Sequence, residues 1–291
     1  MFVEFELKTV KQLWQCTETS PNMSITHIPQ SKLGVSEPPP EWFGNEPNES
    51  NNTNWNNKNW LKSRFHFSFA EYNNPRNMSF GVLRVMNDDL VQPLRGFGAH
   101  PHRDVEICTY IVDGFLTHKD SMGTAESLGR GAVQFMTAGS GVQHSEHNHD
   151  KTNPLRFVQI WITTRTRGLR PNYGSSIGNF EDRKNQFAHL VTDVQNRDSS
   201  VPIKINQDAN IYVAEIDMNN TVNFNVMNDR QAYLLCVEGS IELKTKDRTL
   251  KLLRHDSAEI KSINVEVTSV ENNAHVLIVE MALTRDGRTD L

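Results

Sequence analysis

Short runs of alternating apolar and polar residues recur along most of the chain after residue 60. A period of two is typical of β-strands whose side chains point alternately to the two faces of a sheet. Residues 64–69, 80–85 and 155–162 follow this pattern, and residues 87–89 are expected to form a turn. Further strands are predicted at residues 211–216, 221–226, 232–237, 241–244, 256–260, 265–270 and 276–281. The pattern therefore predicts an all-β protein.

The same pattern predicts two β domains. The turn at residues 238–240 resembles the turn at residues 113–114, and each precedes an alternating strand, which favours a duplicated β-barrel. We expect a first domain at residues 60–175, a polar linker at 176–205 and a second domain at 206–291. Residues 1–59 would then be an N-terminal extension.

The later part of this extension has an unusual composition. Half of the 24 residues from 36 to 59 are Asn or Pro. Such a stretch buries too little apolar surface to offset the entropy lost on ordering. We therefore expect it to be largely flexible from residue 36.

Two polar pairs mark a candidate site between residues 96 and 146. His100 and His102 form the first pair, and His144 and Glu146 form the second. Residues two apart project from the same face of a strand. Glycine-rich turns between the pairs would return the second strand to the first, so three imidazoles and one carboxylate would converge. This donor set suits one divalent ion of iron, manganese, nickel or copper.

The identity of the carboxylate ligand has an alternative. Glu106 shares a face with His102 on an unbroken strand, but at ~3.3 Å per residue it would lie about 13 Å away along that strand. A bulge would bring it closer. Glu146 is preferred, because two strands that each supply two donors make a compact site.

Other titratable residues receive structural interpretations. His66 is expected to be exposed or hydrogen-bonded, and Cys108, which lies on the ligand-bearing face by parity, is expected to be a buried structural cysteine. The remaining histidines of the first domain, which lie in turn-like sequence, are expected to be solvated: His118, His147 and His149. From residue 206 on, the only histidines are His255 and His275. Because they are isolated, the second domain is expected to bind no metal.

Composition narrows the range of partners and locations. The 30 basic and 35 acidic residues give a net charge of −5, which offers no support for direct nucleic-acid binding. The three cysteines are far apart and odd in number, which favours a reducing compartment. No run of about 18 apolar residues predicts a membrane helix. Glu4 and Glu6 argue against a transit peptide. We expect a cytoplasmic protein that could also enter the nucleus.

The donor set also predicts a chemistry. With three neutral imidazoles and one carboxylate, a divalent ion keeps a net positive charge and one or two open positions for dioxygen or a substrate oxygen. It would lower the pKa of a bound enol or phenol, and Glu146 could then act as the catalytic base. Apolar walls for a flat aromatic ligand could come from Phe97, Phe115, Phe135, Met136 and Trp161, although core packing is the simpler role for each.

These motifs also resemble those of a known family. Residues 96–104 read GFGAHPHRD and residues 136–146 read MTAGSGVQHSE, which is similar to the pirin family of the cupin superfamily. Upstream, WLKSRFHFSF at 60–69 and LRVMNDD at 83–89 resemble the subgroup related to bacterial quercetin 2,3-dioxygenases. The resemblance covers residues 60–175 and, less closely, 205–285. The first 59 residues show no counterpart.

The resemblance implies a bicupin, in which two antiparallel β-barrels are stacked and only the N-terminal one binds metal. It implies His100, His102, His144 and Glu146 as ligands and iron(II) as the usual ion, with manganese, nickel or copper as alternatives. Relatives of this kind cleave flavonols such as quercetin with dioxygen. Others are nuclear cofactors of transcription factors that sense redox state through iron. We therefore expect a dioxygenase, with a transcription cofactor as the alternative.

Overall fold

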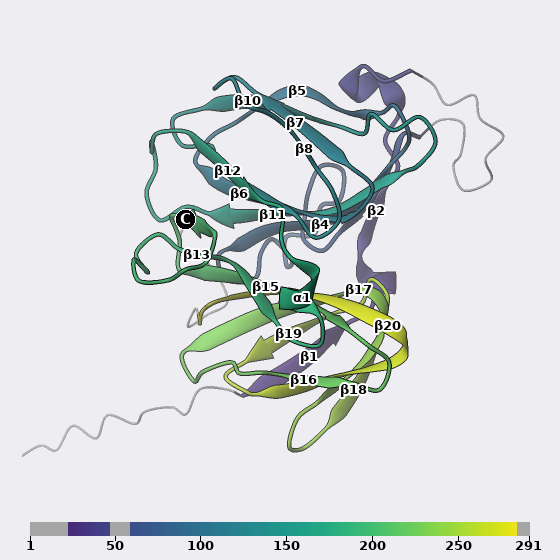
Figure 1. Ribbon diagram of the computed structural model, residues 1–291, viewed down its shortest axis with the longest axis vertical. Coiled ribbons are helices and arrows are strands. Elements are labelled where there is room, and N and C mark those ends of the chain that lie inside the picture. The colour runs from purple at the N-terminus through teal and green to yellow at the C-terminus, as the bar shows by residue number, and fades with distance from the viewer. Residues whose placement is uncertain (1–22, 47–58, 284–291) are drawn as a thin grey trace, which may run out of the picture.

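The computed structural model describes residues 23–46 and 59–283, which form two stacked β domains (Figure 1). The predicted all-β class is confirmed, since the described residues contain many strands and one short α-helix, α1 (Phe180–Arg183). Within the described residues, no helix has the length and the apolar composition that a membrane crossing requires.

The N-terminal domain consists of two antiparallel sheets that face one another. The seven-stranded sheet has the order β12-β9-β6-β11-β4-β3-β2, and the four-stranded sheet has the order β5-β10-β7-β8. The strands of the larger sheet are β2 (Gly34–Ser36), β3 (Leu61–Phe65), β4 (Leu83–Val91), β6 (Val105–Asp113), β9 (Val133–Thr137), β11 (Leu155–Thr163) and β12 (Asn172–Ser176). Those of the smaller sheet are β5 (Gly96–His102), β7 (Leu116–Asp120), β8 (Ala125–Leu128) and β10 (Val142–His147).

The C-terminal domain is a nine-stranded sheet built around two long strands, β17 (Arg230–Lys244) and β20 (Val265–Ala282). Register shifts in β17 between Cys236 and Ile241, with Gly239 at φ +72°, mark an irregular stretch in the middle of this strand. The other strands are β1 (Ser24–Ile28), β13 (Ala188–Asp193), β14 (Ile203–Ile205), β15 (Ala209–Ile216), β16 (Thr221–Phe224), β18 (Thr249–Leu253) and β19 (Ser257–Lys261). All pairs are antiparallel except β13 with β14.

The stretch expected to be a linker, residues 176–205, carries strands of this second sheet. β13 pairs with β15, and β14 pairs with β13. Val191, Ile203 and Ile205 are fully or almost fully buried in the core between the domains. The polar residues around these strands concealed them in the sequence.

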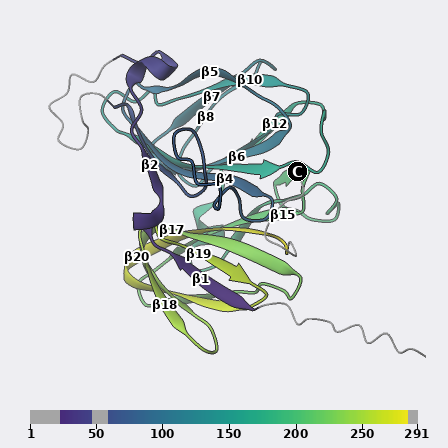
Figure 2. The same ribbon diagram turned by 180° about the vertical axis from the view of Figure 1, so that it is seen from behind.

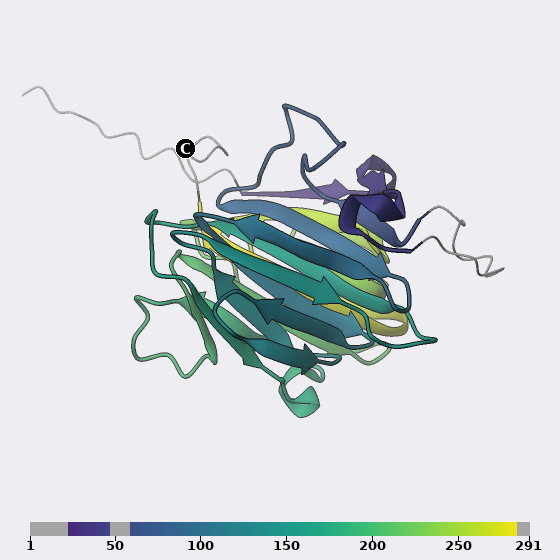
Figure 3. The ribbon, with the colours of Figure 1, turned by 90° about the horizontal axis from the view of Figure 1, so that it is seen from above.

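The N-terminal segment crosses both domains, as Figure 2 shows from behind. β1 pairs with β19 of the C-terminal domain, whereas β2 pairs with β3 of the N-terminal domain. Two 3-10 helices, η1 (Gln30–Lys32) and η2 (Pro40–Phe43), follow β1 and β2 respectively. Seen from above, η2 lies at one side of the N-terminal domain (Figure 3).

Residues 36–46 therefore differ from the flexible chain expected from residue 36. Phe43 packs edge-on against Trp60 and Phe97, with ring centroids 5.6 and 5.3 Å apart. The prolines that precede it have restricted backbone angles even in the unfolded chain, so ordering them costs less entropy. The Asn-rich residues 47–58 lie outside the described residues.

The two domains share an apolar core. Val158, Ile160 and Ile162 of β11 lie in it together with Leu235 and Leu277 of the C-terminal domain. Cys108 and Tyr110 of β6 also belong to this core. Cys108 is fully buried and unpaired, so the predicted structural cysteine is confirmed.

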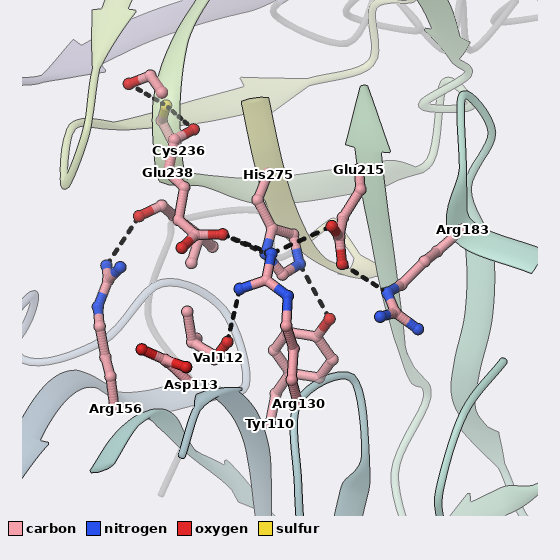
Figure 4. A network of polar contacts seen from close by, with 12 residues as sticks. Tyr110, Val112, Asp113, Arg130, Arg156, Arg183, Glu215, Cys236, Glu238 and His275 are labelled. Atoms are coloured by element: carbon pink, nitrogen blue, oxygen red, sulfur yellow. Dashed lines mark hydrogen bonds and ion pairs between the residues drawn. The ribbon is translucent and has the colours of Figure 1, made fainter. Parts of the chain in front are cut away.

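A polar network crosses the same interface (Figure 4). The Tyr110 hydroxyl group and His275 Nε2 form a hydrogen bond of 2.9 Å. The guanidinium of Arg130 contacts Glu238 at 2.7 Å and Glu215 at 3.1 Å. These residues come from both domains. The network therefore pairs charges across the interface and gives the buried Tyr110 hydroxyl and His275 ring a partner.

The predicted turn at residues 87–89 is wrong, because these residues lie within β4. Asp88 is buried and accepts hydrogen bonds from Arg156 Nε at 2.8 Å and Nη2 at 2.7 Å and from His255 Nδ1 at 2.6 Å. Burial would raise the pKa of Asp88, but the guanidinium of Arg156 and the hydrogen bond from His255 outweigh it and hold the pKa well below its ordinary value. A strand can hold this carboxylate only because both partners reach it from elsewhere in the fold.

Candidate metal centre

The candidate site lies inside the N-terminal domain, where β5 and β10 bring the two polar pairs together. His100 of β5 is the cross-strand neighbour of His144 in β10. On the other side of β10, Glu146 is the neighbour of His118 in β7. A register shift between His144 and Glu146 adjusts the spacing along β10. The second pair thus returns to the first, as the turns in the sequence predict.

Three imidazoles converge in this interior. The ring centroids of His100 and His144 are 4.6 Å apart, and His102 lies 4.8 Å from each of them. One nitrogen from each ring lies within 4.8 Å of the others. His144 is buried, and neither of its nitrogens has a hydrogen-bond partner. A buried, unpaired imidazole is costly unless a ligand or an ion satisfies it.

The imidazoles are held in the neutral form that coordinates metal. Burial lowers the pKa of His102 to about 4 and that of His144 to about 2, and it also lowers the pKa of His100. His100 Nδ1 donates to the carbonyl oxygen of Gly98 over 2.7 Å. Its Nε2 therefore carries the free lone pair, in the arrangement usual for a ligating histidine.

Glu146 lies deeper in the same interior. Its carboxylate accepts hydrogen bonds from Gln159 at 2.7 Å, Gln134 at 2.9 Å and Thr109 at 3.2 Å. Burial raises its pKa to about 7, although these three donors favour the ionised form. One carboxylate oxygen lies within 4.8 Å of donor nitrogens of His144 and His118. The four-ligand set of His100, His102, His144 and Glu146 stays a prediction. His144 is the residue that lies close to both the other two imidazoles and the carboxylate.

His118 was expected in solvent, and this prediction is wrong. The residue lies in β7 rather than in a turn and is only 1% exposed. Its ring stacks on Tyr173 at 4.5 Å, and its Nε2 contacts Asp120 Oδ2 at 3.1 Å. The inward alternation of Leu116 and His118 was the available signal, but the polar sequence around them obscured it. The exposed His149 agrees with the prediction, whereas His147 is half-buried and stacks on it.

Glu106 and Cys108 do not lie on the ligand-bearing face. β5 ends at His102 and β6 begins at Val105, and between them Asp104 adopts φ +52°. The chain turns there into the other sheet, which breaks the parity that an unbroken strand would keep. Glu106 accepts hydrogen bonds from Thr137 at 2.8 Å and Asn206 at 3.1 Å. It therefore belongs to the domain interface.

A surface groove adjoins the site at His102. The groove encloses about 570 Å³ and is lined by Pro101, His102, Arg103, Ser121, Ser140, Gly141, Val142 and Gln143. This volume is in the range of small-molecule sites. Trp161 stands edge-on to His102 at 4.8 Å, and its buried indole N–H has no hydrogen-bond partner. Of the other proposed wall residues, Phe97 lies 6.4 Å from His100, Phe115 is 61% exposed, and Phe135 and Met136 are buried in core clusters.

These residues fit a divalent transition metal. Neutral imidazole nitrogens and one carboxylate are ligands that iron, nickel, copper and manganese accept, and unpaired buried nitrogens at His144 are directed into the same interior. The fixed tautomer of His100 adds the orientation that a ligand needs.

Comparison with known proteins places this arrangement in a family. Residues 48–162 match the family described as Pirin, and residues 191–281 match the Quercetinase C-terminal cupin domain. A pirin-like protein of Caulobacter vibrioides is 36% identical over 223 residues, which are 77% of this chain and 93% of that protein. The chain belongs to the pirin family. The match begins at residue 48, within the extension that showed no counterpart in the sequence.

Two further pirin relatives bear on chemistry. The quercetin 2,3-dioxygenase of Escherichia coli K12 is 37% identical over 190 residues, covering 64% of this chain and 78% of that protein. The bacterial pirin YhhW of Escherichia coli, solved in complex with nickel(II), superposes with a TM-score of 0.73 at 27% identity and covers 90% of this chain and 100% of that one. The predicted bicupin fold is confirmed. This pirin is a metal-binding cupin with a histidine and glutamate cluster in its N-terminal domain.

Proposed function

We propose that this pirin is a metal-dependent dioxygenase that cleaves quercetin-like flavonols with dioxygen. His100, His102, His144 and Glu146 would hold the ion, with iron(II) as the resident metal and manganese, nickel or copper as alternatives. The observation that carries the proposal is the convergence of neutral imidazoles beside a buried carboxylate, next to a groove that reaches the surface. The oxidoreductase class is supported by the relatives named as quercetin 2,3-dioxygenases.

The ligand residues set the charge of the site. A bound divalent ion supplies Lewis acidity toward an enol oxygen and the one-electron reactivity that dioxygen requires. The three histidines are neutral, so only Glu146 offsets the charge of the cation. The low pKa values of His102 and His144 keep their lone pairs available at neutral pH.

Glu146 is the proposed catalytic base. Gln134, Gln159 and Thr109 hold its carboxylate in one orientation by donating to it. It would accept the proton of the flavonol 3-hydroxyl group at a carboxylate oxygen, which leaves the substrate as an enolate that is electron-rich toward dioxygen. The same three donors would stabilise the carboxylate before the transfer and keep it beside the substrate.

The walls of the site suit a flat aromatic substrate. The face of a flavonol can pack beside Trp161, and the free indole N–H of that residue can donate to a substrate oxygen. Phe43 and Phe97, whose rings lie 5.7 and 6.4 Å from that of His100, provide apolar surface on the other side. This placement would keep bulk water away from the enolate.

The test is aerobic turnover of quercetin by protein loaded with one metal at a time. We expect metal-dependent loss of flavonol absorbance together with oxygen consumption. Glu146→Gln should keep its metal and lose about 10² to 10⁴-fold in rate. No metal-dependent loss with iron, copper, nickel or manganese would exclude quercetin as substrate. A transcription-factor partner and a nuclear location both stay predictions, because nothing in the described part of the chain tests them.

A further inference from the structure

His118 has an unsatisfied buried nitrogen that the proposed dioxygenase site does not use. The side chain is 1% exposed, and its Nδ1 has no hydrogen-bond partner. Its Nε2 lies 3.1 Å from Asp120 Oδ2. The other oxygen of Asp120 accepts from the backbone N–H groups of Met122 at 2.8 Å and Thr124 at 3.1 Å. These backbone hydrogen bonds therefore fix the orientation of Asp120 independently of His118.

This arrangement is the one that protein metal sites use to orient a ligand. A ligating histidine almost always donates its second ring N–H to a carboxylate or a carbonyl group, which sets the tautomer and leaves the other nitrogen unprotonated. Because Asp120 can only accept as a carboxylate, Nε2 of His118 carries the hydrogen. The lone pair of Nδ1 is then left without a partner in the interior, at a cost of desolvation that an ion would offset.

The neighbours of His118 complete a set of donors. Donor atoms of His118, His144 and Glu146 lie within 4.8 Å of one another, and all three residues are buried. The rings of His118 and His144 are 5.3 Å apart. His144 also belongs to the set with His100 and His102, and both of its nitrogens are unpaired. The two sets therefore adjoin one another at a single residue.

We propose that the centre offers a cation two adjoining positions, an outer one at His100, His102 and His144, to which Glu146 adds the fourth ligand of the proposed set, and an inner one at His118, His144 and Glu146. One divalent transition metal ion would occupy one position at a time, since the sets share His144 and two dications would repel each other at this distance. The inner position has two nitrogens and one oxygen and suits nickel, copper or iron. His118 is thereby a further metal ligand. The inference rests on the metal-binding part of the proposed function and is independent of its substrate.

The test removes the outer position and measures nickel(II) binding to the full-length protein. In H100A/H102A we expect calorimetric titration to give about one nickel per chain, with weaker affinity than in the wild type. Adding H118A should lower the remaining nickel affinity by at least about tenfold. Loss of a residue that only hydrogen-bonds a metal ligand already costs about this much, and loss of a ligand should cost no less. Adding H149A, at an exposed histidine, should leave the affinity unchanged.

Copper(II) electron paramagnetic resonance gives a second readout. Hyperfine coupling to two nitrogens is expected in H100A/H102A and to one nitrogen after H118A is added. Folding is checked by circular dichroism, and H100Q/H102Q carries the same comparison if the alanine double variant does not fold. A folded H100A/H102A that binds no nickel, or an affinity indifferent to H118A, would overturn the inner position. Either result leaves flavonol cleavage by the outer set to be judged on its own assay.

Discussion

The two domains of this pirin share a β architecture but have opposite interiors. The N-terminal domain directs His100, His144 and Glu146 inward, together with amide side chains that bind the carboxylate. The corresponding space of the C-terminal domain is filled by a cluster that includes Phe224, Ile241 and Leu243. The fold therefore tolerates either content. The difference lies in the side chains that point inward.

The histidines of the two domains differ in the same way. Both groups of potential metal donors found among the described residues lie in the N-terminal domain. In the C-terminal domain, His255 and His275 lie at the domain interface, where each contacts an acidic residue, Asp88 and Glu238 respectively. His144 and His118 have unpaired nitrogens in a common interior, whereas His255 and His275 each have a ring nitrogen paired with a carboxylate. The comparison indicates that free lone pairs, rather than histidine content, distinguish the metal site.

The sharpest test of this comparison is a pair of substitutions with opposite effects. His144→Ala should keep the fold and lower metal affinity by more than about 100-fold, because the residue belongs to both donor sets. His275→Ala should keep the metal and lower the free energy of unfolding by about 1 to 3 kcal/mol, because Tyr110 and Glu238 lose a buried partner. Metal content by mass spectrometry and urea denaturation measure the two effects. Retained metal in His144→Ala would contradict the assignment.

The apolar interior of the C-terminal domain should be sensitive to volume and insensitive to metal. Leu243→Ala should cost about 2 to 5 kcal/mol, since the side chain is fully buried. This cost should be equal in apo and metal-loaded protein. Leu253→Ala, at a residue that is 46% exposed, is the matched control and should change stability by less than about 0.5 kcal/mol. By contrast, wild-type protein with free metal at about 100 times its Kd should be more stable than the metal-free protein by about 2.7 kcal/mol.

His66, a buried histidine between the domains, should make the free energy of unfolding depend on pH in the acid range. Burial lowers the pKa of His66 to about 4, against an ordinary value of 6.5, with Asp88 opposing and His255 and Arg64 reinforcing the shift. The unfolded chain binds a proton below pH 6.5 and the folded chain does not, so stability is full above pH 6.5 and falls as the pH drops toward 4. The loss should be about 3 kcal/mol.

The measurement compares wild type with His66→Gln over this range at one fixed metal concentration, because the metal ligands also titrate in acid. The difference in the free energy of unfolding between the two proteins should change by the stated amount from pH 7 to pH 4. Parallel curves would show that His66 does not contribute.

The smallest effect on metal affinity is expected where the N-terminal segment packs beside His100. Phe43→Ala removes ring contacts to Trp60, Phe97 and His100 and should cost about 2 kcal/mol, roughly half the value for a fully buried phenylalanine. Metal affinity should fall by only a few-fold. Trp42→Ala, at the adjacent residue, which is 57% exposed, should change neither quantity. An equal effect at both positions would show that the segment does not pack as described.

The sequence predicted those parts of the site that depend on strand periodicity alone. His100 with His102, and His144 with Glu146, each occupy one continuous strand, so their common face follows from the spacing of two. The prediction that Glu106 and Cys108 share the ligand-bearing face was wrong, because the chain turns at Asp104 and no local sequence pattern indicates this turn. The all-β fold class could be predicted for the same reason, because it also follows from the period of two along the strands.

The residues that the sequence missed depend on distant partners. Asp88 appeared to be a turn residue, because Arg156 and His255 lie 68 and 167 positions away. His118 appeared solvated, because the ring that covers it comes from Tyr173 on a different strand. Residues 36–46 appeared flexible, because the apolar surface that receives Phe43 is formed by Trp60 and Phe97. In each case burial is decided by tertiary contacts that no short window contains.

The pairing of β1 with β19 has a consequence for synthesis of the chain on the ribosome. His27 finds its partner Asp256 only after 229 further residues have been added. At about 5 to 20 residues per second, this wait is on the order of ten to fifty seconds, and domains generally fold as they emerge. The N-terminal domain can therefore form while β1 is still unpaired, and β1 joins the C-terminal sheet only after β19 has been synthesised.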